Sequence, residues 1–282
     1  MKNVLNTDLT GKVAVVTGAG GVLCSQFAAV LARAGAKVAL LDINEEAARA
    51  VAQVICEEGG TARAYRCDVL SAETCRQVAD QVQSDLGPCD ILINGAGGNN
   101  PRATTDKEYY FEGDLDAEVK SFFDLDADGV SFVFNLNFLG TLLPTQAFAR
   151  QMLGRPGCNI LNISSMNAFT PLTKIPAYSG AKAAISNFTQ WLAVHFSKAG
   201  IRVNAIAPGF FVTKQNEKLL FDADGNPTPR TGKILAATPM GRFGKAEELS
   251  GAVLFLLNNE AASFITGVVL PIDGGFSAYS GV

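Results

Sequence analysis

The sequence contains one histidine, His195, and this scarcity limits the chemistry available to the protein. A single imidazole excludes metal sites built from several histidines and leaves little room for a Ser-His-Asp hydrolytic triad. The six cysteines include no C-x-x-C pair and lie in no turn-rich scaffold, so neither a redox motif nor a disulfide framework is indicated. We expect reduced, mostly buried cysteines and a cytoplasmic protein.

Long apolar runs and an excess of basic charge are absent as well. No stretch approaches the roughly 18 apolar residues of a transmembrane helix, and the first residues form no secretory signal. Against 23 Lys and Arg stand 27 Asp and Glu, a formal charge of −4, so neither nucleic acid nor an anionic membrane is an expected partner. With 282 residues, 48% of them hydrophobic, and no linker or repeat, we expect one domain over residues 1–282.

Short β-branched runs alternate with amphipathic stretches along the chain. Strands are expected at Lys12–Thr17, Lys37–Leu41, Ala62–Arg66, Ile91–Ile93, Asn159–Ile163, Arg202–Ile206 and Val268–Ile272. Helices are expected at Ser25–Ala34, Glu45–Glu58, Ala72–Leu86, Phe132–Met152, Ala177–Lys198 and Ala246–Leu257. This alternation indicates βαβ units with right-handed crossovers, so the predicted fold is α/β with a doubly wound, Rossmann-like parallel sheet.

Two segments interrupt the alternation. Thr105–Gly129 holds nine acids against two lysines, and we interpret it as an acidic insertion after the fourth strand, serving as a solvated rim, a lid or a subunit contact. Within it, Asp124-x-Asp126-x-Asp128 is similar to the start of a calcium loop, but Asn135 stands where a bidentate glutamate is needed, so no metal is expected. Phe210–Phe243 contains three prolines and is interpreted as an irregular, mobile substrate cover.

A glycine-rich loop, Thr17-Gly18-Ala19-Gly20-Gly21, lies between the first expected strand and the first expected helix. Glycines there let the backbone approach a pyrophosphate, which the N-terminus of the helix stabilises. The spacing is not G-x-G-x-x-G, because Leu23 occupies the sixth position, and a plain glycine turn is the alternative.

Acidic and small residues at the ends of the next strands extend this candidate nucleotide site. Asp42 follows Gly18 by 24 positions, where a carboxylate accepts hydrogen bonds from the ribose hydroxyls and repels a 2′-phosphate, so NAD is favoured over NADP. Asp68 follows the third strand and could meet the adenine edge. Each of these aspartates could instead cap the helix that follows it. Asn94-Gly95-Ala96-Gly97 ends the fourth strand, where small residues let a cofactor lie close.

Three side chains point to acid–base catalysis. Tyr178 and Lys182 are four residues apart in an expected helix, so they share one face. A free tyrosine has a pKa of about 10, and a nearby ammonium group should lower that pKa and allow proton exchange with an alcohol or carbonyl. Ser165, 13 residues before Tyr178, can hold the same substrate oxygen.

These features together resemble the short-chain dehydrogenase/reductase family over nearly the whole chain. The stretches that carry the resemblance are Ile163–Ser165, Ala177–Lys182, Arg202–Gly209 and Asp273–Gly275. The glycine loop departs from the family's T-G-x-x-x-G-x-G, because it is one residue shorter and Leu23 stands where the last glycine would be.

The resemblance implies roles for the site residues. Tyr178 would be the general acid/base, Ser165 would position the reacting oxygen, Lys182 would also hold the nicotinamide ribose, and Asn137 would support a water-linked proton relay. The expected cofactor contacts are Gly18, Gly20, Gly21, Val22, Leu23, Asp42, Asp68, Val69, Asn94, Ala96, Gly97, Tyr178, Lys182, Pro208, Gly209, Phe211, Val212 and Thr213. A homotetramer or homodimer is implied, with helices near Phe132–Met152 and Ala177–Lys198 between subunits.

Within the family, the chain is similar to oxidoreductases that act on sugar acids, in Gly20–Cys24, Gly97–Pro101 and Gly274–Val282. Such a polyhydroxylated anion requires amide groups and a cation. We expect the substrate to contact Asn99, Asn100, Arg102, Ser165 and Asn167, with Arg102 pairing with the carboxylate. Lys174, Lys214, Asn216 and Arg230 are further candidates, or solvated loop residues.

Three other functions remain open. A reductase of carrier-linked 3-oxoacyl chains would require a basic docking patch at a mouth that is acidic here. Another sugar or polyol could be the substrate. A non-catalytic NAD-binding sensor would have no need of Ser165, Tyr178 and Lys182 together.

Overall fold

The computed structural model describes residues 6–212 and 220–281. Its centre is a seven-stranded sheet in the order β3-β2-β1-β4-β5-β6-β7, and all neighbouring strands are parallel. The strands are β1 (Val13–Thr17), β2 (Lys37–Asp42), β3 (Thr61–Arg66), β4 (Ile91–Asn94), β5 (Asn159–Ile163), β6 (Arg202–Pro208) and β7 (Val269–Ile272). The predicted Rossmann-like parallel sheet is therefore confirmed.

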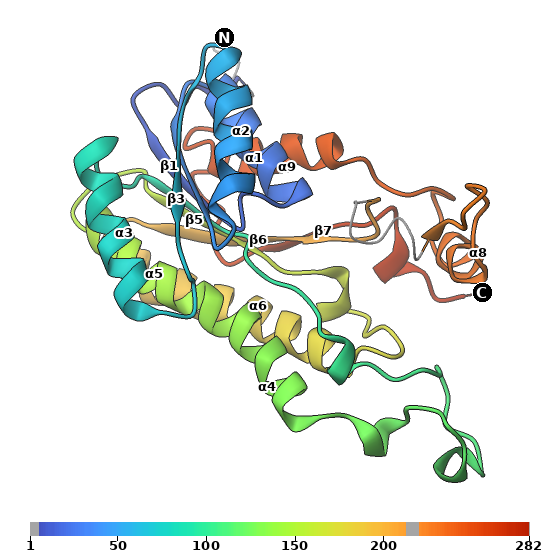
Figure 1. The fold of residues 1–282 in the computed structure, drawn as a ribbon. Coiled ribbons are helices and arrows are strands. Elements are labelled where there is room, and N and C mark those ends of the chain that lie inside the picture. Colours follow the sequence, from blue (N-terminus) through green and yellow to red (C-terminus); the bar gives the residue numbers. More distant parts are fainter. Residues whose placement is uncertain (1–5, 213–219, 282) are drawn as a thin grey trace.

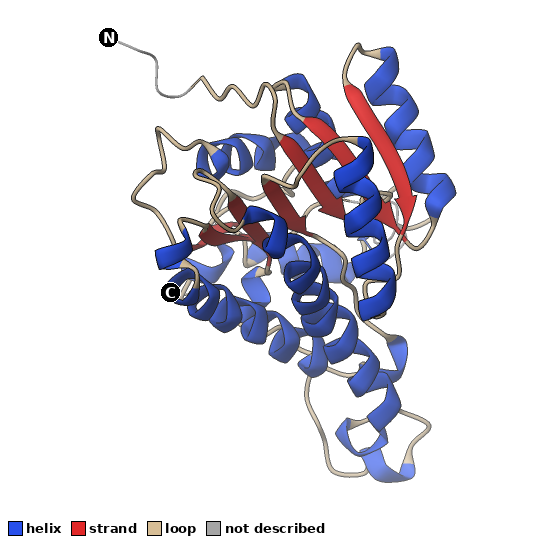
Figure 2. Ribbon diagram, turned by 90° about the vertical axis from the view of Figure 1, so that its left-hand side faces the viewer, coloured by secondary structure: helices blue, strands red, loops and turns tan. Residues whose placement is uncertain are grey.

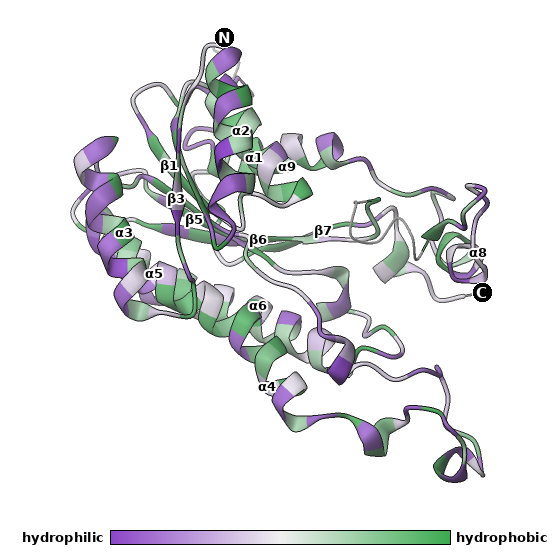
Figure 3. Ribbon diagram, in the orientation of Figure 1, coloured by the Kyte–Doolittle hydropathy of each residue, from purple (hydrophilic) through white to green (hydrophobic). Residues whose placement is uncertain are grey.

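Helices cover both faces of the sheet (Figures 1 and 2). On one face lie α1 (Val22–Arg33), α2 (Glu45–Glu57) and α9 (Ser250–Leu257). On the other lie α3 (Ala72–Asp85), α5 (Gly140–Met152) and α6 (Pro176–His195). Because helices cover both faces of the central strands, all five residues of β1 and all four of β4 are buried, whereas the edge strand β3 keeps exposed residues. Figure 3 shows the matching hydropathy, with mixed helix surfaces around apolar strands.

The expected helix Phe132–Met152 is divided in two. Asp126 accepts a hydrogen bond from Gly129 N and caps α4 (Ala127–Phe134), which begins before the expected start. A π-helical turn, Asn135–Leu139, separates α4 from α5. Such turns insert an extra residue into the helical repeat and re-aim side chains, often at functional sites. Asn137, the expected relay residue, lies in this turn.

The segment interpreted as irregular, Phe210–Phe243, contains a helix, α8 (Pro229–Ala236). Thr228 caps it by accepting a hydrogen bond from Thr231 N, and Pro229 occupies its first turn. Proline is favoured there because its missing N–H would have had no intrahelical partner. The prolines that suggested irregular structure therefore include a helix start, and the mobility of this cover stays a prediction.

The acidic segment between β4 and α4 contains three short 3-10 turns and extends away from the sheet (Figure 1). Some of its acidic side chains are held by nearby residues. Asp114 accepts a hydrogen bond from Lys107 at 2.5 Å, and Asp124 closes a capping box with Ser121. Asp124 and Asp126 thus serve as helix caps, and residues 6–212 and 220–281 contain no group of three or more His, Cys, Asp or Glu able to hold a metal ion. Within those same residues, no helix is both long and apolar enough to span a membrane.

Candidate active site

The predicted site residues meet where three neighbouring strands end. Gly18 follows β1, Gly95 follows β4, and Ser165 lies two residues beyond β5. Because these strands are parallel and adjacent in the sheet, their carboxyl ends lie side by side. In open α/β sheets this edge is where ligands bind.

Tyr178, Ser165 and Lys182 form a compact group at this edge. Tyr178 and Lys182 lie on successive turns of α6, and the Lys182 Nζ lies 5.6 Å from the centre of the Tyr178 ring. The Tyr178 hydroxyl interacts with the Ser165 side chain, and the Lys182 amine donates to the Ile163 carbonyl at 2.8 Å. The structure thus brings together the three residues predicted to perform acid–base chemistry.

The pKa values at this group differ in part from the sequence-based expectation. Burial raises the pKa of Tyr178 above its usual value, and the hydrogen bond from Ser165 offsets part of that rise. Burial also lowers the pKa of Lys182 to about 8, because the neutral amine is favoured away from water. The expectation that Lys182 gives Tyr178 a lowered pKa is therefore not met, because desolvation has the larger effect.

Asn137 presents an unpaired acceptor to the same space. Its Nδ2 donates to the carbonyls of Gly98 and Val133, both at 2.8 Å. Its Oδ1 is buried and accepts no hydrogen bond from the described residues. A Cβ added at Gly97 would lie 2.6 Å from that oxygen and 3.3 Å from Lys182 Nζ. Asn137 and Lys182 therefore face one small space, kept open because residue 97 is glycine.

The glycine loop is held against the ends of β2 and β4. Gly18 has a left-handed φ of 67°, and an added Cβ would lie 2.9 Å from Ala96 Cα, so glycine is required there. Gly20 N donates to Asp42 Oδ2 at 2.9 Å, and Asn44 N donates to Oδ1 at 2.9 Å. Asn44, not Asp42, caps α2. The Asp42 carboxylate is therefore oriented between the loop and the next helix.

Asp68 and Asn94, at the ends of β3 and β4, have different environments. Asp68 accepts a hydrogen bond from Leu70 N, and Ser71 rather than Asp68 caps α3. Asn94 is buried, and its Nδ2 donates to Thr145 and Asn162 at 2.9 Å each. The Asn94 side chain thus joins β4 to β5 and α5 in the core.

The remaining predicted cofactor contacts follow α1 and β6. Val22 and Leu23 open α1, and Val69 packs beside Gly140. Pro208 ends β6, Gly209 N donates to Ile272, and Phe211 is buried and bridged to Gly244. Val212 is the last described residue before a gap, and Thr213, Lys214 and Asn216 lie outside the described residues.

The expected substrate residues are engaged with their own loop. Asn99 Nδ2 donates to Thr104, and Asn100 Oδ1 accepts from Arg102 N at 2.8 Å. The Arg102 guanidinium pairs with Asp126 at 2.7 Å and lies 3.6 Å from Asp128. A substrate carboxylate at Arg102 would therefore have to share the guanidinium with Asp126 and Asp128 or displace one of them. The sequence shows that Arg102 lies close to an acidic segment, but it does not show which carboxylate the guanidinium contacts.

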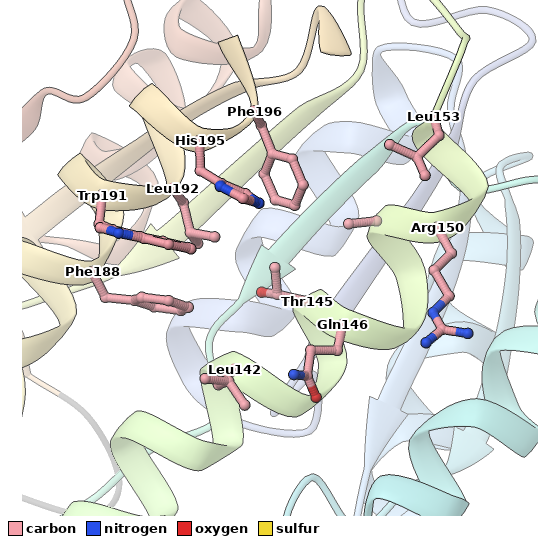
Figure 4. A pocket seen from close by; sticks show the side chains of 11 residues that line it. Leu142, Thr145, Gln146, Arg150, Leu153, Phe188, Trp191, Leu192, His195 and Phe196 are labelled. Carbon is pink, nitrogen blue, oxygen red and sulfur yellow. The ribbon is translucent and has the colours of Figure 1, made fainter. Parts of the chain in front are cut away.

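A separate groove lies on the outer side of α5 and α6 (Figure 4). Leu142, Phe188, Trp191 and His195 line it, and the rings of Trp191 and His195 stack at 4.5 Å. Phe188 is ten residues beyond Tyr178, about 15 Å along the helix. His195 thus takes part in surface stacking, as its late helix position suggested.

Comparison with known proteins identifies the class to which this fold and site belong. A family model described as short chain dehydrogenase matches residues 12–223. The chain therefore belongs to the short-chain dehydrogenase/reductase family of NAD(P)-dependent oxidoreductases.

Particular relatives cover the whole chain. A crystal structure of a candidate D-mannonate oxidoreductase from Haemophilus influenzae with bound NAD is 63% identical, covers 100% of both chains and has a TM-score of 0.95. An uncharacterised oxidoreductase, UxuB, of Bacillus subtilis is 51% identical over 99% of each chain. The 7alpha-hydroxysteroid dehydrogenase of Escherichia coli is 34% identical over 98% of each.

We expect replacement of Lys182 by methionine to stabilise the fold near neutral pH. Lys182 is 5% exposed, and burial lowers its pKa from 10.5 to about 8, so its charged form costs stability at pH 7. Lys182→Met should raise the free energy of unfolding by about 2 kcal/mol at pH 7, allowing for the lost hydrogen bond. Urea denaturation measures this difference.

The pH dependence of that difference has a defined sign. Between pH 8 and 10.5 the unfolded wild type binds more protons than the folded one, so wild-type stability rises with pH. The advantage of Lys182→Met should therefore shrink across that range. If the free energies of unfolding of wild type and Lys182→Met are equal at pH 7, or if their difference grows with pH, the charge of buried Lys182 does not cost stability.

Proposed function

We propose that the protein transfers a hydride between NAD(H) and a sugar acid, with D-fructuronate as the ketone and D-mannonate as the alcohol. The observation that carries the proposal is the group of Tyr178, Ser165 and Lys182 beside the unpaired Asn137 Oδ1. A scaffold without turnover would gain nothing from a desolvated amine and a buried unpaired acceptor, both of which cost stability.

The residues at the strand ends fit a dinucleotide. Gly18 lets the loop pack against the backbone of Ala96, Gly97 keeps open a space that a Cβ would fill, and the N-terminus of α1 follows the glycine loop. Gly18, Gly20 and Gly21 would hold the pyrophosphate, and Asp42 would accept the ribose hydroxyls. The relative with bound NAD supports this cofactor. Bound NAD(H) would accept or supply the hydride.

The side chains of this chain would handle the proton. The Tyr178 hydroxyl would donate a proton to the substrate carbonyl oxygen in reduction and accept one from the alcohol in oxidation. Ser165, already hydrogen-bonded to Tyr178, would hold that oxygen in place. Lys182 and Asn137 border the space in which a water would resupply the proton. The roles of Tyr178, Ser165, Lys182 and Asn137 in this proposal are the ones predicted from the sequence.

A polyhydroxylated anion suits the polar residues beyond β4 and β5. Asn99 and Asn100 follow β4, and Asn167 follows Ser165 after β5. The likeness to the candidate D-mannonate oxidoreductase over the whole chain supports the same substrate class. The likeness to a hydroxysteroid dehydrogenase makes a steroid ketone the alternative that most needs testing.

An NADH-oxidation screen tests this function directly. D-fructuronate should be reduced at least about tenfold more efficiently, in kcat/KM, than 3-oxoacyl thioesters, 7-oxo steroids or uncharged ketoses, because a missing charged contact costs that much. NADH should be preferred over NADPH. Activity confined to thioesters or steroids would overturn the substrate, and NAD binding without any turnover would instead support a sensor.

We also propose a cytoplasmic homotetramer or homodimer. The groove on α5 and α6 (Figure 4) supports an interface there, because Trp191, which lines it, is 56% exposed beside Leu142, Leu153 and Phe188. Large apolar side chains gathered on one face commonly mark contact surfaces.

A further inference from the structure

Three basic residues belong to separate segments that meet near one carboxylate, Glu108. Lys233, on α8, contacts both carboxylate oxygens of Glu108 in the acidic segment, at 2.8 and 2.9 Å. Arg230 lies three residues earlier on α8, so it shares the helix face of Lys233. Lys174 belongs to the turn that precedes α6.

Lys174 is held by the backbone of the acidic segment. Its carbonyl accepts a hydrogen bond from Thr105 N at 2.9 Å, three residues before Glu108. Its φ of 72° makes it the one non-glycine residue in the left-handed region among those described. That conformation costs free energy in a lysine and is typically retained where function requires it. Lys174 is four residues before Tyr178, so this backbone position is tied to the catalytic helix.

The charges of this group do not balance. Lys233 contacts Glu108 directly, Arg230 lies one turn before Lys233 on α8, and the Lys174 backbone is bonded to Thr105, so all three cations belong to segments that meet at this carboxylate, and all three lower its pKa. Other cations of the acidic segment already have partners, Arg102 in Asp126 and Lys107 in Asp114. Within the described residues, the Lys174, Arg230 and Lys233 group therefore retains positive charge beyond what Glu108 neutralises.

The position of these cations fits the carboxylate end of the substrate, which lies away from the reacting ketone. In D-fructuronate the carboxylate lies several carbons from the ketone, so its partner must stand away from Tyr178. The acidic segment and α8 both lie beyond the sheet on its right-hand side in Figure 1, and the Glu108–Lys233 pair joins them. Arginine and lysine are the side chains that bind a carboxylate by charge-assisted hydrogen bonds.

We propose that Lys174 and Arg230 form the carboxylate-binding subsite for the sugar-acid substrate, while the Glu108–Lys233 pair positions α8 beside the acidic segment. This inference rests on the proposed function. Arg102, the carboxylate partner expected from the sequence, already pairs with Asp126. The proposal therefore assigns the substrate carboxylate to Lys174 and Arg230 instead.

Kinetics of six variants test the subsite. Lys174→Gln and Arg230→Gln should each raise KM for D-fructuronate about tenfold or more, with kcat within about threefold of wild type, because a charged hydrogen bond is lost far from the reacting carbon. KM for an uncharged ketose should not change. Arg49→Gln, an exposed arginine paired with Glu45 on α2, is the matched control and should behave as wild type.

The fourth variant, Arg102→Gln, separates the two assignments. If it alone raises KM for D-fructuronate, the carboxylate binds at Arg102 and our subsite is overturned. Unchanged KM in both Lys174→Gln and Arg230→Gln overturns it equally. Lys174→Arg and Arg230→Lys keep the charge and should largely restore KM, which distinguishes a lost contact from a damaged fold.

Calorimetric titration with D-mannonate separates failure of the subsite from failure of the proposed function. If the wild type reduces no sugar acid, the proposed function fails. Binding of D-mannonate to the NAD-saturated wild type, lost in Arg230→Gln, would still support an anion site at Lys174 and Arg230. Absence of D-mannonate binding to the wild type would overturn both.

Discussion

Tyr178→Phe is expected to lower kcat about 1,000-fold while NAD affinity stays within about twofold of wild type. The substitution removes only the hydroxyl that interacts with Ser165, and a positioned acid or base typically contributes about 10² to 10⁴ in rate. Steady-state NADH oxidation and fluorescence titration of NADH measure the two quantities.

A second tyrosine provides the control. Tyr65 on β3 is buried and its hydroxyl donates to Asp85 at 3.0 Å, on the strand at the edge of the sheet away from β5. Tyr65→Phe should leave kcat within about twofold, since no acid–base group is lost near the reacting atoms. Retained turnover in Tyr178→Phe would show that another group transfers the proton and would remove the basis of the proposed mechanism.

The raised pKa of Tyr178 adds a pH signature. Because burial favours the protonated phenol, the phenolate needed to oxidise D-mannonate becomes more abundant as pH rises through the raised pKa. The oxidation rate should therefore still increase above neutral pH, and Tyr178→Phe should abolish that increase. A flat oxidation profile in the wild type would contradict this role.

Asp42→Asn is expected to raise the ratio of NADPH to NADH efficiency, in kcat/KM, about 100-fold. It removes the carboxylate that would repel a 2′-phosphate, and like charges in contact cost several kcal/mol. The amide oxygen can still accept from a backbone N–H, so the contacts with Gly20 and Asn44 are partly kept. Steady-state rates with both nucleotides provide the ratio.

A neighbouring carboxylate tests whether the effect is local. Glu45, at the start of α2, pairs with Arg49, so Glu45→Gln removes the same charge three residues later. That variant should leave the cofactor ratio within about threefold. An equal change in both variants would show that general surface charge, rather than Asp42, selects NAD.

The structure also explains why some sequence-based predictions succeeded. Strand runs such as Val13–Thr17 are buried on both sides, and a parallel sheet buried in this way leaves short, nearly continuous apolar runs in the sequence. Tyr178 and Lys182 were found because helical spacing alone places them on one face. Local patterns of this kind require no knowledge of distant contacts.

Two helix starts were missed, and in both cases a capping residue directly before the helix sets the start. The start of α4 depends on the Asp126 cap, and α8 begins at Pro229 in a segment whose prolines suggested irregular structure. Of these, the Thr228-Pro229 start could have been recognised from the sequence, since threonine caps and proline at the first turn are known signals.

The sequence by itself determined the order of strands and helices along the chain and the positions of the glycine loop, Asp42, Ser165, Tyr178 and Lys182, because spacing along the chain encodes these. The acid–base chemistry of the last three stays a prediction. Only the tertiary structure decided the charge environment. Burial raises the pKa of Tyr178 and lowers the pKa of Lys182. Asp126 pairs with Arg102, and Glu108 pairs with Lys233, which is 125 positions away in the sequence. Desolvation and ion pairing depend on distances in space, and those distances arise only once the chain has folded.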